Sequence, residues 1–279
     1  MDKIKMIGLD LDGTLLTDEK TVTDYTWDVL NKAMDMGVEI VIATGRPFSG
    51  IPKELRSCSR FRYMVTANGG RILDIKENKI LYEKLVPFDK AVDILKVFEK
   101  YDTLREVYFD GYGYLNKDML EEIYTYYLTG PMVEYISTTR IGVDDIWKKM
   151  EEKKGCGLDK VHGVFANTDE QAMALEELNN LGGLEITNAL GNNLEVNPEG
   201  VDKGEGLIML GKIIGIKPGE IMACGDGTND LKMVQKVGLG VAMENAHEVV
   251  KKAANYITVS NEEDGVAKAI EKYVLTREG

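Results

Sequence analysis

The sequence has 279 residues, 44% hydrophobic and 29% charged, which suits one large domain or two ordinary ones. Its formal net charge of −13 argues against binding to nucleic acid or anionic lipid, because an acidic surface repels phosphate groups. No apolar run approaches the roughly 20 residues of a membrane-spanning helix, and the first residues show no secretory pattern. We therefore expect a cytoplasmic protein with no membrane or nucleic-acid partner.

The rare residue types exclude several kinds of site. The cysteines, Cys58, Cys156 and Cys224, are far apart and odd in number, so they indicate neither a disulfide framework nor a zinc site. Two histidines, His162 and His247, make a His-rich metal centre or a Ser-His-Asp triad improbable.

Short apolar strands alternate with amphipathic helices at the start of the chain. The run Val38–Ala43 is apolar apart from Glu39, and such a run is typical of a parallel strand buried on both faces. Strands are expected at 5–11, 38–43 and 63–66, and helices at 24–36 and about 51–58.

The middle of the chain reads as a mixed α+β segment. A hairpin is expected at 71–83, around Lys76-Glu77-Asn78. Beyond it we expect strands near 106–109, 112–115, 160–165 and 184–188, and helices at 89–99, 117–127, about 143–152 and 169–181.

The last part of the chain returns to alternating strands and helices. Strands are expected at 220–224, 239–242 and 256–259, and helices at 204–214, 228–236, 246–254 and 263–274. This alternation predicts an α/β protein with a doubly wound, Rossmann-like parallel sheet. Residues 1–84 and 190–279 would form this core, and 85–189 would form an inserted α+β domain.

Two aspartates, Asp10 and Asp12, follow the first strand in the run Leu9-Asp10-Leu11-Asp12-Gly13-Thr14-Leu15. Aspartate is rarely buried unless it is paired or bound to metal, and ligands of open α/β sheets lie at the carboxyl ends of the strands. The alternative is a plain Asp-Gly turn.

The second strand ends in Thr44-Gly45-Arg46. The hydroxyl of Thr44 and the backbone N–H groups that follow it could hold phosphate oxygens. Alternatively, Thr44 is a helix cap and Arg46 a surface side chain.

Lys203 opens a predicted helix, where a positive charge opposes the helix dipole at a cost of ~0.3–1 kcal/mol. An anion facing Lys203 would explain this placement. The alternative is a solvated lysine that pairs with Asp202 or Glu205.

The strand 220–224 leads into Gly225-Asp226-Gly227-Thr228-Asn229-Asp230. A cluster of carboxylate and amide oxygens suits Mg²⁺. An Asx-type turn that caps the next helix would explain Asn229 and Asp230 but would leave Asp226 without a role.

In this order, the four strand ends resemble the motifs of the haloacid dehalogenase superfamily, over essentially the whole chain. Asp10-Leu11-Asp12-Gly13-Thr14-Leu15 is similar to the first motif, Thr44 to the second, Lys203 to the third and Gly225–Asp230 to the fourth. The position of the insert resembles the type IIB cap of the Cof-like branch. One departure is Ala67-Asn68-Gly69-Gly70, where relatives usually show Asn-Gly-Ala.

The resemblance implies a phosphatase that forms an aspartyl phosphate on Asp10, with Asp12 as general acid and base. Mg²⁺ would be bound by Asp10, Asp226 and the backbone carbonyl of Asp12. Thr44 and Lys203 would then bind the phosphoryl oxygens.

Further roles are expected for the neighbours of these residues. The backbone at Gly45 and the side chains of Arg46 and Asn229 would contribute to substrate binding, with Asn229 orienting the phosphate or Lys203. Asp230 would support Lys203 or a metal-bound water.

The substrate would be a small phosphorylated metabolite, read by the insert acting as a cap, and the protein a monomer or homodimer. Two other functions stay open: a sugar phosphomutase of the same fold and a non-catalytic sensor of a phosphorylated ligand. A mutase would be activated by a sugar bisphosphate, whereas a sensor would not need both Asp10 and Asp12.

Overall fold

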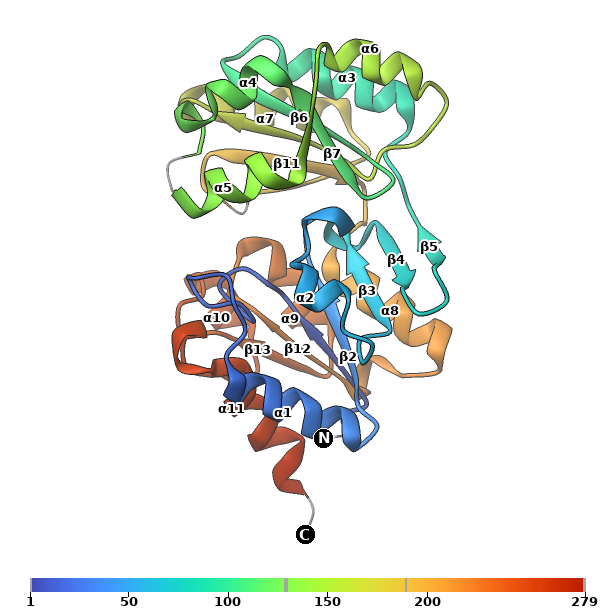
Figure 1. Cartoon of the computed structure of the whole chain (residues 1–279), viewed down its shortest axis with the longest axis vertical. Coiled ribbons are helices and arrows are strands. Elements are labelled where there is room, and N and C mark those ends of the chain that lie inside the picture. The colour runs from blue at the N-terminus through green and yellow to red at the C-terminus, as the bar shows by residue number, and fades with distance from the viewer. Residues whose placement is uncertain (1, 128–129, 189, 278–279) are drawn as a thin grey trace. The chain divides into compact units, whose positions relative to one another are not determined.

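In a computed structural model, which describes residues 2–127, 130–188 and 190–277, the chain forms two compact units. The first comprises Met1–Gly45, Lys53–Tyr82 and Asp202–Gly279, and the second Arg46–Pro52 and Glu83–Val201. Each unit is built on one β-sheet (Figure 1). Residue 189, at the predicted boundary of the insert, lies outside the described residues.

The first unit contains an eight-stranded sheet in the order β14-β13-β12-β1-β2-β3-β4-β5. Its strands from β14 to β3 are parallel, and β4 runs antiparallel to β3. The strands are β1 (Met6–Leu9), β2 (Glu39–Ala43), β3 (Tyr63–Thr66), β4 (Arg71–Asp74), β5 (Lys79–Glu83), β12 (Ile221–Gly225), β13 (Leu239–Ala242) and β14 (Tyr256–Ile257). The predicted α/β class with a parallel sheet is therefore confirmed.

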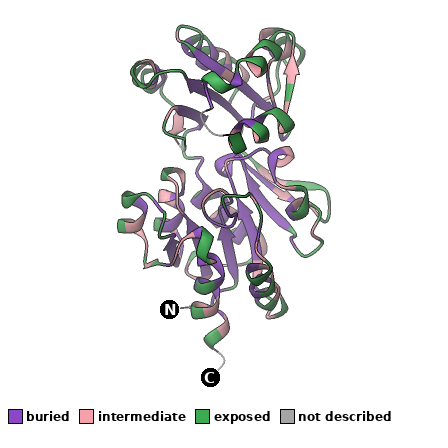
Figure 2. Cartoon of the chain, turned by 60° about the vertical axis from the view of Figure 1, so that its left-hand side comes forward, coloured by how far each residue is buried: buried purple, intermediate pink, exposed green. Residues whose placement is uncertain are grey.

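Helices cover this sheet because its central strands are apolar on both faces. Its helices are α1 (Asp24–Asp35), α2 (Lys53–Arg56), α8 (Lys203–Ile214), α9 (Leu231–Lys236), α10 (Glu248–Ala253) and α11 (Gly265–Tyr273). Met6 and Val41 face α8 and α9 and pack with Leu207. By alternation along the strand, Ile7 and Ile42 belong to the other face, and both are fully buried. The strands of this sheet carry mostly the buried colour in Figure 2.

The register of the sheet brings three strand ends to one edge. Leu9 of β1 lies opposite Ile42 of β2 and Cys224 of β12. The residues that follow these strands therefore emerge side by side, at the carboxyl edge where open α/β sheets bind their ligands.

The second unit contains a six-stranded mixed sheet in the order β10-β11-β9-β6-β7-β8. The strands are β6 (Thr103–Phe109), β7 (Tyr112–Asn116), β8 (Arg140–Val143), β9 (Lys160–Phe165), β10 (Leu184–Thr187) and β11 (Asn193–Pro198). The helices are α3 (Phe88–Phe98), α4 (Lys117–Glu121), α5 (Gly130–Thr139), α6 (Ile146–Glu152) and α7 (Thr168–Leu181). Side chains of α3, α6 and α7 pack with Val107, Phe109 and Val161 in an apolar core.

The structure differs from the expected elements mainly in this unit. The expected helix 117–127 ends at Glu121 and continues as a separate 3₁₀ turn, Ile123–Thr125. Helix α5 was not anticipated. Strand β11, which the predicted boundary near residue 190 would assign to the core, pairs with β9 and β10 because Leu194 and Val196 belong to the apolar core of the second unit.

The remaining 3₁₀ turns are short: η1 (Phe48–Gly50), η2 (Ala67–Gly69), η4 (Pro218–Glu220), η5 (Thr228–Asp230), η6 (Asn261–Glu263) and η7 (Leu275–Arg277). Among the residues the structure describes, no helix has the length and apolar character needed to cross a membrane.

Candidate active site

Asp10 and Lys203 form a buried ion pair at the carboxyl edge of the first unit's sheet. Asp10 directly follows β1, and Lys203 is the first residue of α8. The Lys203 Nζ donates to Asp10 Oδ1 at 2.7 Å and to Asp230 Oδ1 at 2.6 Å. Lys203 is 0% exposed, so it is not the solvated lysine of the alternative interpretation. Instead, Lys236 is the residue that pairs with Asp202 and Glu205.

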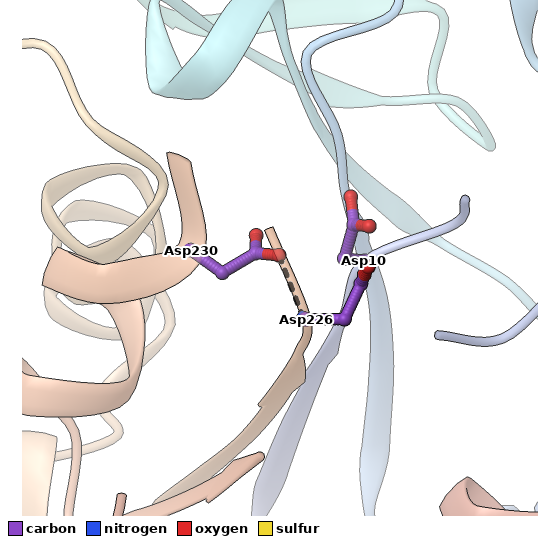
Figure 3. A group of neighbouring side chains, drawn as sticks. All are labelled: Asp10, Asp226 and Asp230. Atoms are coloured by element: carbon purple, nitrogen blue, oxygen red, sulfur yellow. Dashed lines mark hydrogen bonds between the residues drawn. The ribbon is translucent and has the colours of Figure 1, made fainter. Parts of the chain in front are cut away.

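Asp230 organises the loop after β12. Its Oδ2 accepts a hydrogen bond from the backbone N–H of Asp226 at 3.0 Å (Figure 3). The same Oδ2 accepts from the N–H of Gly227 at 2.9 Å, while Oδ1 accepts from Lys203. A Cβ on Gly225 would lie 2.5 Å from the Asp230 Cβ, so this close approach requires glycine. With both oxygens occupied in this way, Asp230 holds Lys203 and the loop in place.

Asp226 is fixed from the loop that follows β1. The Thr14 Oγ1 donates to Asp226 Oδ1 at 2.8 Å, and a Cβ on Gly13 would lie 2.4 Å from Asp226 Oδ2. Gly13 also has a φ of +73°, which glycine adopts without strain. The Asp-Gly-Thr sequence thus lets the first loop close tightly on the fourth motif.

Three carboxylates meet at this edge of the sheet. One oxygen each from Asp10, Asp226 and Asp230 lies within 4.8 Å of the others (Figure 3). Burial, together with the charge of Asp230, raises the pKa of Asp10 well above its usual value and that of Asp226 to about 7. Burial opposes the charged form of Lys203, but Asp10 and Asp230 raise its pKa overall.

The donor set fits a hard divalent cation. Three carboxylates, of which Asp10 and Asp230 are buried and Asp226 is half-buried, face one ammonium group. The excess of negative charge adds to the effect of burial in raising the pKa values of Asp10 and Asp226. Mg²⁺ prefers carboxylate oxygens and would offset this charge.

Asp12 is held by a residue that the sequence motifs do not indicate. Lys20 Nζ donates to Asp12 Oδ1 at 2.9 Å, and both side chains are about one-third exposed. Lys20 itself has a φ of +61° and closes a turn through its backbone N–H to Thr17. The Asp12 carboxylate is therefore directed to a cation on its own loop and is absent from the three-carboxylate cluster.

The second motif is divided between the two units. Thr44 follows β2, is 2% exposed, and its backbone N–H donates to Val65 O at 2.9 Å. Gly45 is half-buried and ends the first segment of the core unit. Arg46 groups with the second unit, where its guanidinium donates to Gly50 O at 2.8 Å and lies 4.1 Å from the ring centre of Tyr135. Substrate contacts of Thr44, Gly45 and Arg46 stay predictions.

Asn229 lies in η5 and is half-buried. Its Nδ2 donates to the Asn68 Oδ1 at 3.5 Å, so Asn68 is part of the same edge. Thr14, Lys20 and Asn68 are the residues that sequence reasoning did not assign to the site. Thr14 and Lys20 were indicated only by their place inside or just after the first motif, and Asn68 only by the departure at Ala67-Asn68-Gly69-Gly70.

A family model for haloacid dehalogenase-like hydrolases matches residues 7–270 of the chain. The chain belongs to this family. A 5-amino-6-(5-phospho-D-ribitylamino)uracil phosphatase of Bacillus subtilis (strain 168), YcsE, is 34% identical over 98% of this chain and 96% of its own length.

Solved structures agree with this assignment. A haloacid dehalogenase-like hydrolase from Bacteroides thetaiotaomicron is 30% identical, with a TM-score of 0.81 over 97% of this chain and 99% of its own. The subclass IIB sugar phosphatase BT4131 is 25% identical, with a TM-score of 0.79 over 96% of this chain and 98% of its own. The expected Cof-like, type IIB relationship is thereby confirmed, and the chain is a phosphohydrolase of the haloacid dehalogenase superfamily.

Proposed function

We propose that the protein is a Mg²⁺-dependent phosphatase of small phosphomonoesters that forms an aspartyl phosphate on Asp10. The observation that carries this proposal is the position of the buried Asp10 carboxylate. It accepts a hydrogen bond from Lys203 and is adjacent to the carboxylate of Asp226. A nucleophile needs such a fixed position, and a phosphate dianion needs a compensating positive charge beside it.

The first step is an in-line displacement at phosphorus. A carboxylate oxygen of Asp10 forms the new O–P bond while the bond from phosphorus to the leaving oxygen breaks. Asp12 gives its proton to the leaving oxygen, so that an alcohol departs.

The second step releases phosphate. The Asp12 carboxylate takes a proton from water as the water oxygen attacks phosphorus, and the bond from phosphorus to Asp10 breaks. This restores the Asp10 carboxylate and the protonated Asp12, so each turnover consumes one water molecule.

Other residues of the site bind charge. Mg²⁺ held by Asp10, Asp226 and the Asp12 carbonyl would offset the repulsion between carboxylate and phosphate. Lys203 stabilises the negative charge on the transferring group, and Asp230 holds Lys203. Thr44 and the backbone at Gly45 donate hydrogen bonds to the phosphoryl oxygens.

The substrate we propose is a phosphorylated metabolite with a hydroxyl-rich leaving group. Support comes from relatives that are called a 5-amino-6-(5-phospho-D-ribitylamino)uracil phosphatase and a sugar phosphatase. In the proposed reaction the second unit, including Arg46, recognises the leaving group. The protein acts in the cytoplasm as a monomer or homodimer.

The test is release of inorganic phosphate from a panel of phosphomonoesters that includes 5-amino-6-(5-phospho-D-ribitylamino)uracil, hexose and pentose phosphates, and p-nitrophenyl phosphate. We expect release with Mg²⁺, none with a chelator and none from Asp10→Asn. Asp28→Asn is the matched control, because Asp28 is exposed on α1 of the same unit. Normal turnover by Asp10→Asn would exclude the covalent route.

A further inference from the structure

A turn with an unusual backbone follows β3. Ala67, Asn68 and Gly69 have φ values of +51°, +56° and +102°, so three consecutive residues occupy a region that L-residues rarely adopt. Ala67 and Asn68 are each 2% exposed. Such conformations cost free energy and persist where surrounding contacts hold them, which is common at functional sites.

The turn touches three of the segments that carry the proposed phosphate site. The Asn68 N–H donates to Thr44 O at 3.1 Å. A Cβ on Gly69 would lie 2.2 Å from Asp202 O, the residue before Lys203. The Asn68 Oδ1 accepts from Asn229 Nδ2 at 3.5 Å. The unusual backbone thus places the Asn68 side chain against Asn229 while the turn packs between the Thr44 and Lys203 segments.

We propose that Asn68 is a positioning residue that orients the Asn229 amide for the phosphoryl group, an inference that rests on the proposed phosphatase function. Accepting one hydrogen of Asn229 Nδ2 leaves the other hydrogen free to donate to a phosphoryl oxygen. The 3.5 Å separation is long for a hydrogen bond, and contacts of this kind often tighten only when substrate is bound.

Asparagine is suited to this position because its short polar side chain tolerates the left-handed conformation better than most residues. Glycine tolerates that conformation still better but has no amide. Asn68→Gly therefore separates the backbone requirement from the function of the side chain.

The experiment measures kcat and KM for p-nitrophenyl phosphate with Mg²⁺, together with the melting temperature. We expect Asn68→Gly to melt within about 4 °C of the wild type and to lose about 10- to 100-fold in kcat, the size of effect that misplacement of a binding group produces. The matched control is Asn78→Gly, since Asn78 also has a positive φ, of +49°, but is exposed in the β4–β5 turn. Its kcat should equal that of the wild type.

A double-variant cycle tests the link to Asn229. If Asn68 acts through Asn229, Asn68→Gly should lower kcat of the Asn229→Ala protein by less than threefold. Full additivity of the two losses would overturn the inference, as would a wild-type kcat in folded Asn68→Gly.

A conservative variant covers the case in which Asn68→Gly does not fold. Asn68→Asp keeps the shape and the acceptor oxygen, so kcat should stay within about threefold of the wild type while KM for the anionic substrate rises. A larger fall in kcat for folded Asn68→Asp would also overturn the inference. Absence of turnover in the wild type would instead reject the proposed function, and the role of Asn68 with it.

Discussion

The ammonium group of Lys203 donates a 2.7 Å hydrogen bond to the carboxylate of Asp10, a residue 193 positions earlier in the chain. A second hydrogen bond, of 2.6 Å, joins the Lys203 ammonium group to the Asp230 carboxylate. Because all three groups are buried, each charge depends on the others for its compensation. Removing the ammonium group would therefore leave two buried carboxylates without their counter-charge.

Lys203→Met should lower both activity and stability. Loss of the positive charge beside the transferring phosphoryl group should reduce kcat about 10²- to 10³-fold. Leaving Asp10 and Asp230 without their partner should cost about 3–5 kcal/mol of unfolding free energy. Phosphate release and urea unfolding measure the two effects. Lys212→Met, at an exposed position of the same helix, should change neither kcat nor the free energy of unfolding. Equal losses in Lys212→Met would contradict a specific role of Lys203.

Thr14→Val should weaken Mg²⁺ binding while preserving the fold. The substitution keeps the side-chain shape but removes the 2.8 Å hydrogen bond that orients Asp226. Groups that support metal ligands in this way typically contribute 10- to 100-fold to affinity, so the Mg²⁺ concentration for half-maximal activity should rise by about that factor. Thr17→Val is the control, because Thr17 Oγ1 bonds to Thr21 rather than to the site. An unchanged Mg²⁺ dependence in Thr14→Val would contradict the assigned role of Thr14.

Motif residues that follow buried strands were predictable from sequence. Asp10 and Asp226 directly follow apolar strands, and parallel pairing of those strands brings them to one edge. The placement of Lys203 at a helix start was an anomaly that an anion could explain, and the structure supplies Asp10 and Asp230 as its partners.

Contacts that depend on tertiary packing could not be predicted from the sequence. Thr14 and Asp226 are 212 positions apart, and no periodic pattern links them. The positive φ of Ala67 is equally invisible, because alanine carries no preference for that conformation. Strand β11 was missed for a different reason: its polar residues Asn193 and Asn197 are buried, so it lacks the continuous apolar run used to find strands.

A buried glutamate in the second unit accepts three side-chain hydrogen bonds and lies near a histidine. Glu106 is 0% exposed and accepts from Arg140 Nε at 2.9 Å and Tyr127 Oη at 3.0 Å, with a further bond from Tyr108 and His162 Nδ1 3.5 Å away. Burial raises the pKa of Glu106, but Arg140 and His162 outweigh it and hold the pKa well below its usual range. The folded state thus favours the ionised form.

Glu106→Gln should destabilise the second unit in a pH-dependent way. It leaves the Arg140 guanidinium buried without its counter-charge, which should cost about 3–5 kcal/mol at pH 7. The folded pKa lies below the ordinary value of 4.5, so the stabilisation is present above pH 4.5 and is lost as pH falls toward the folded pKa. The difference between wild type and variant should therefore shrink below pH 4.5. Urea unfolding across pH measures it; exposed Glu121→Gln should show no difference, and a constant gap for Glu106→Gln would refute the assignment.

The three-carboxylate cluster should make the metal-free wild type less stable than a variant that has one negative charge fewer at this site. Asp226→Asn removes one negative charge from a buried site that holds a single ammonium group, and it keeps an oxygen for Thr14. In chelator, the free energy of unfolding of this variant should therefore exceed that of the wild type by ~0.5–2 kcal/mol, and its melting temperature should be higher. The variant should also lose activity. Mg²⁺ should reverse the order, because a ligand that binds only the folded state stabilises by about 2.7 kcal/mol at 100 times its Kd. Scanning calorimetry of both proteins with and without Mg²⁺ tests this. Equal Mg²⁺-induced shifts in the two proteins would show that the ion binds elsewhere, since Asp226→Asn lacks the carboxylate on which the proposed site depends.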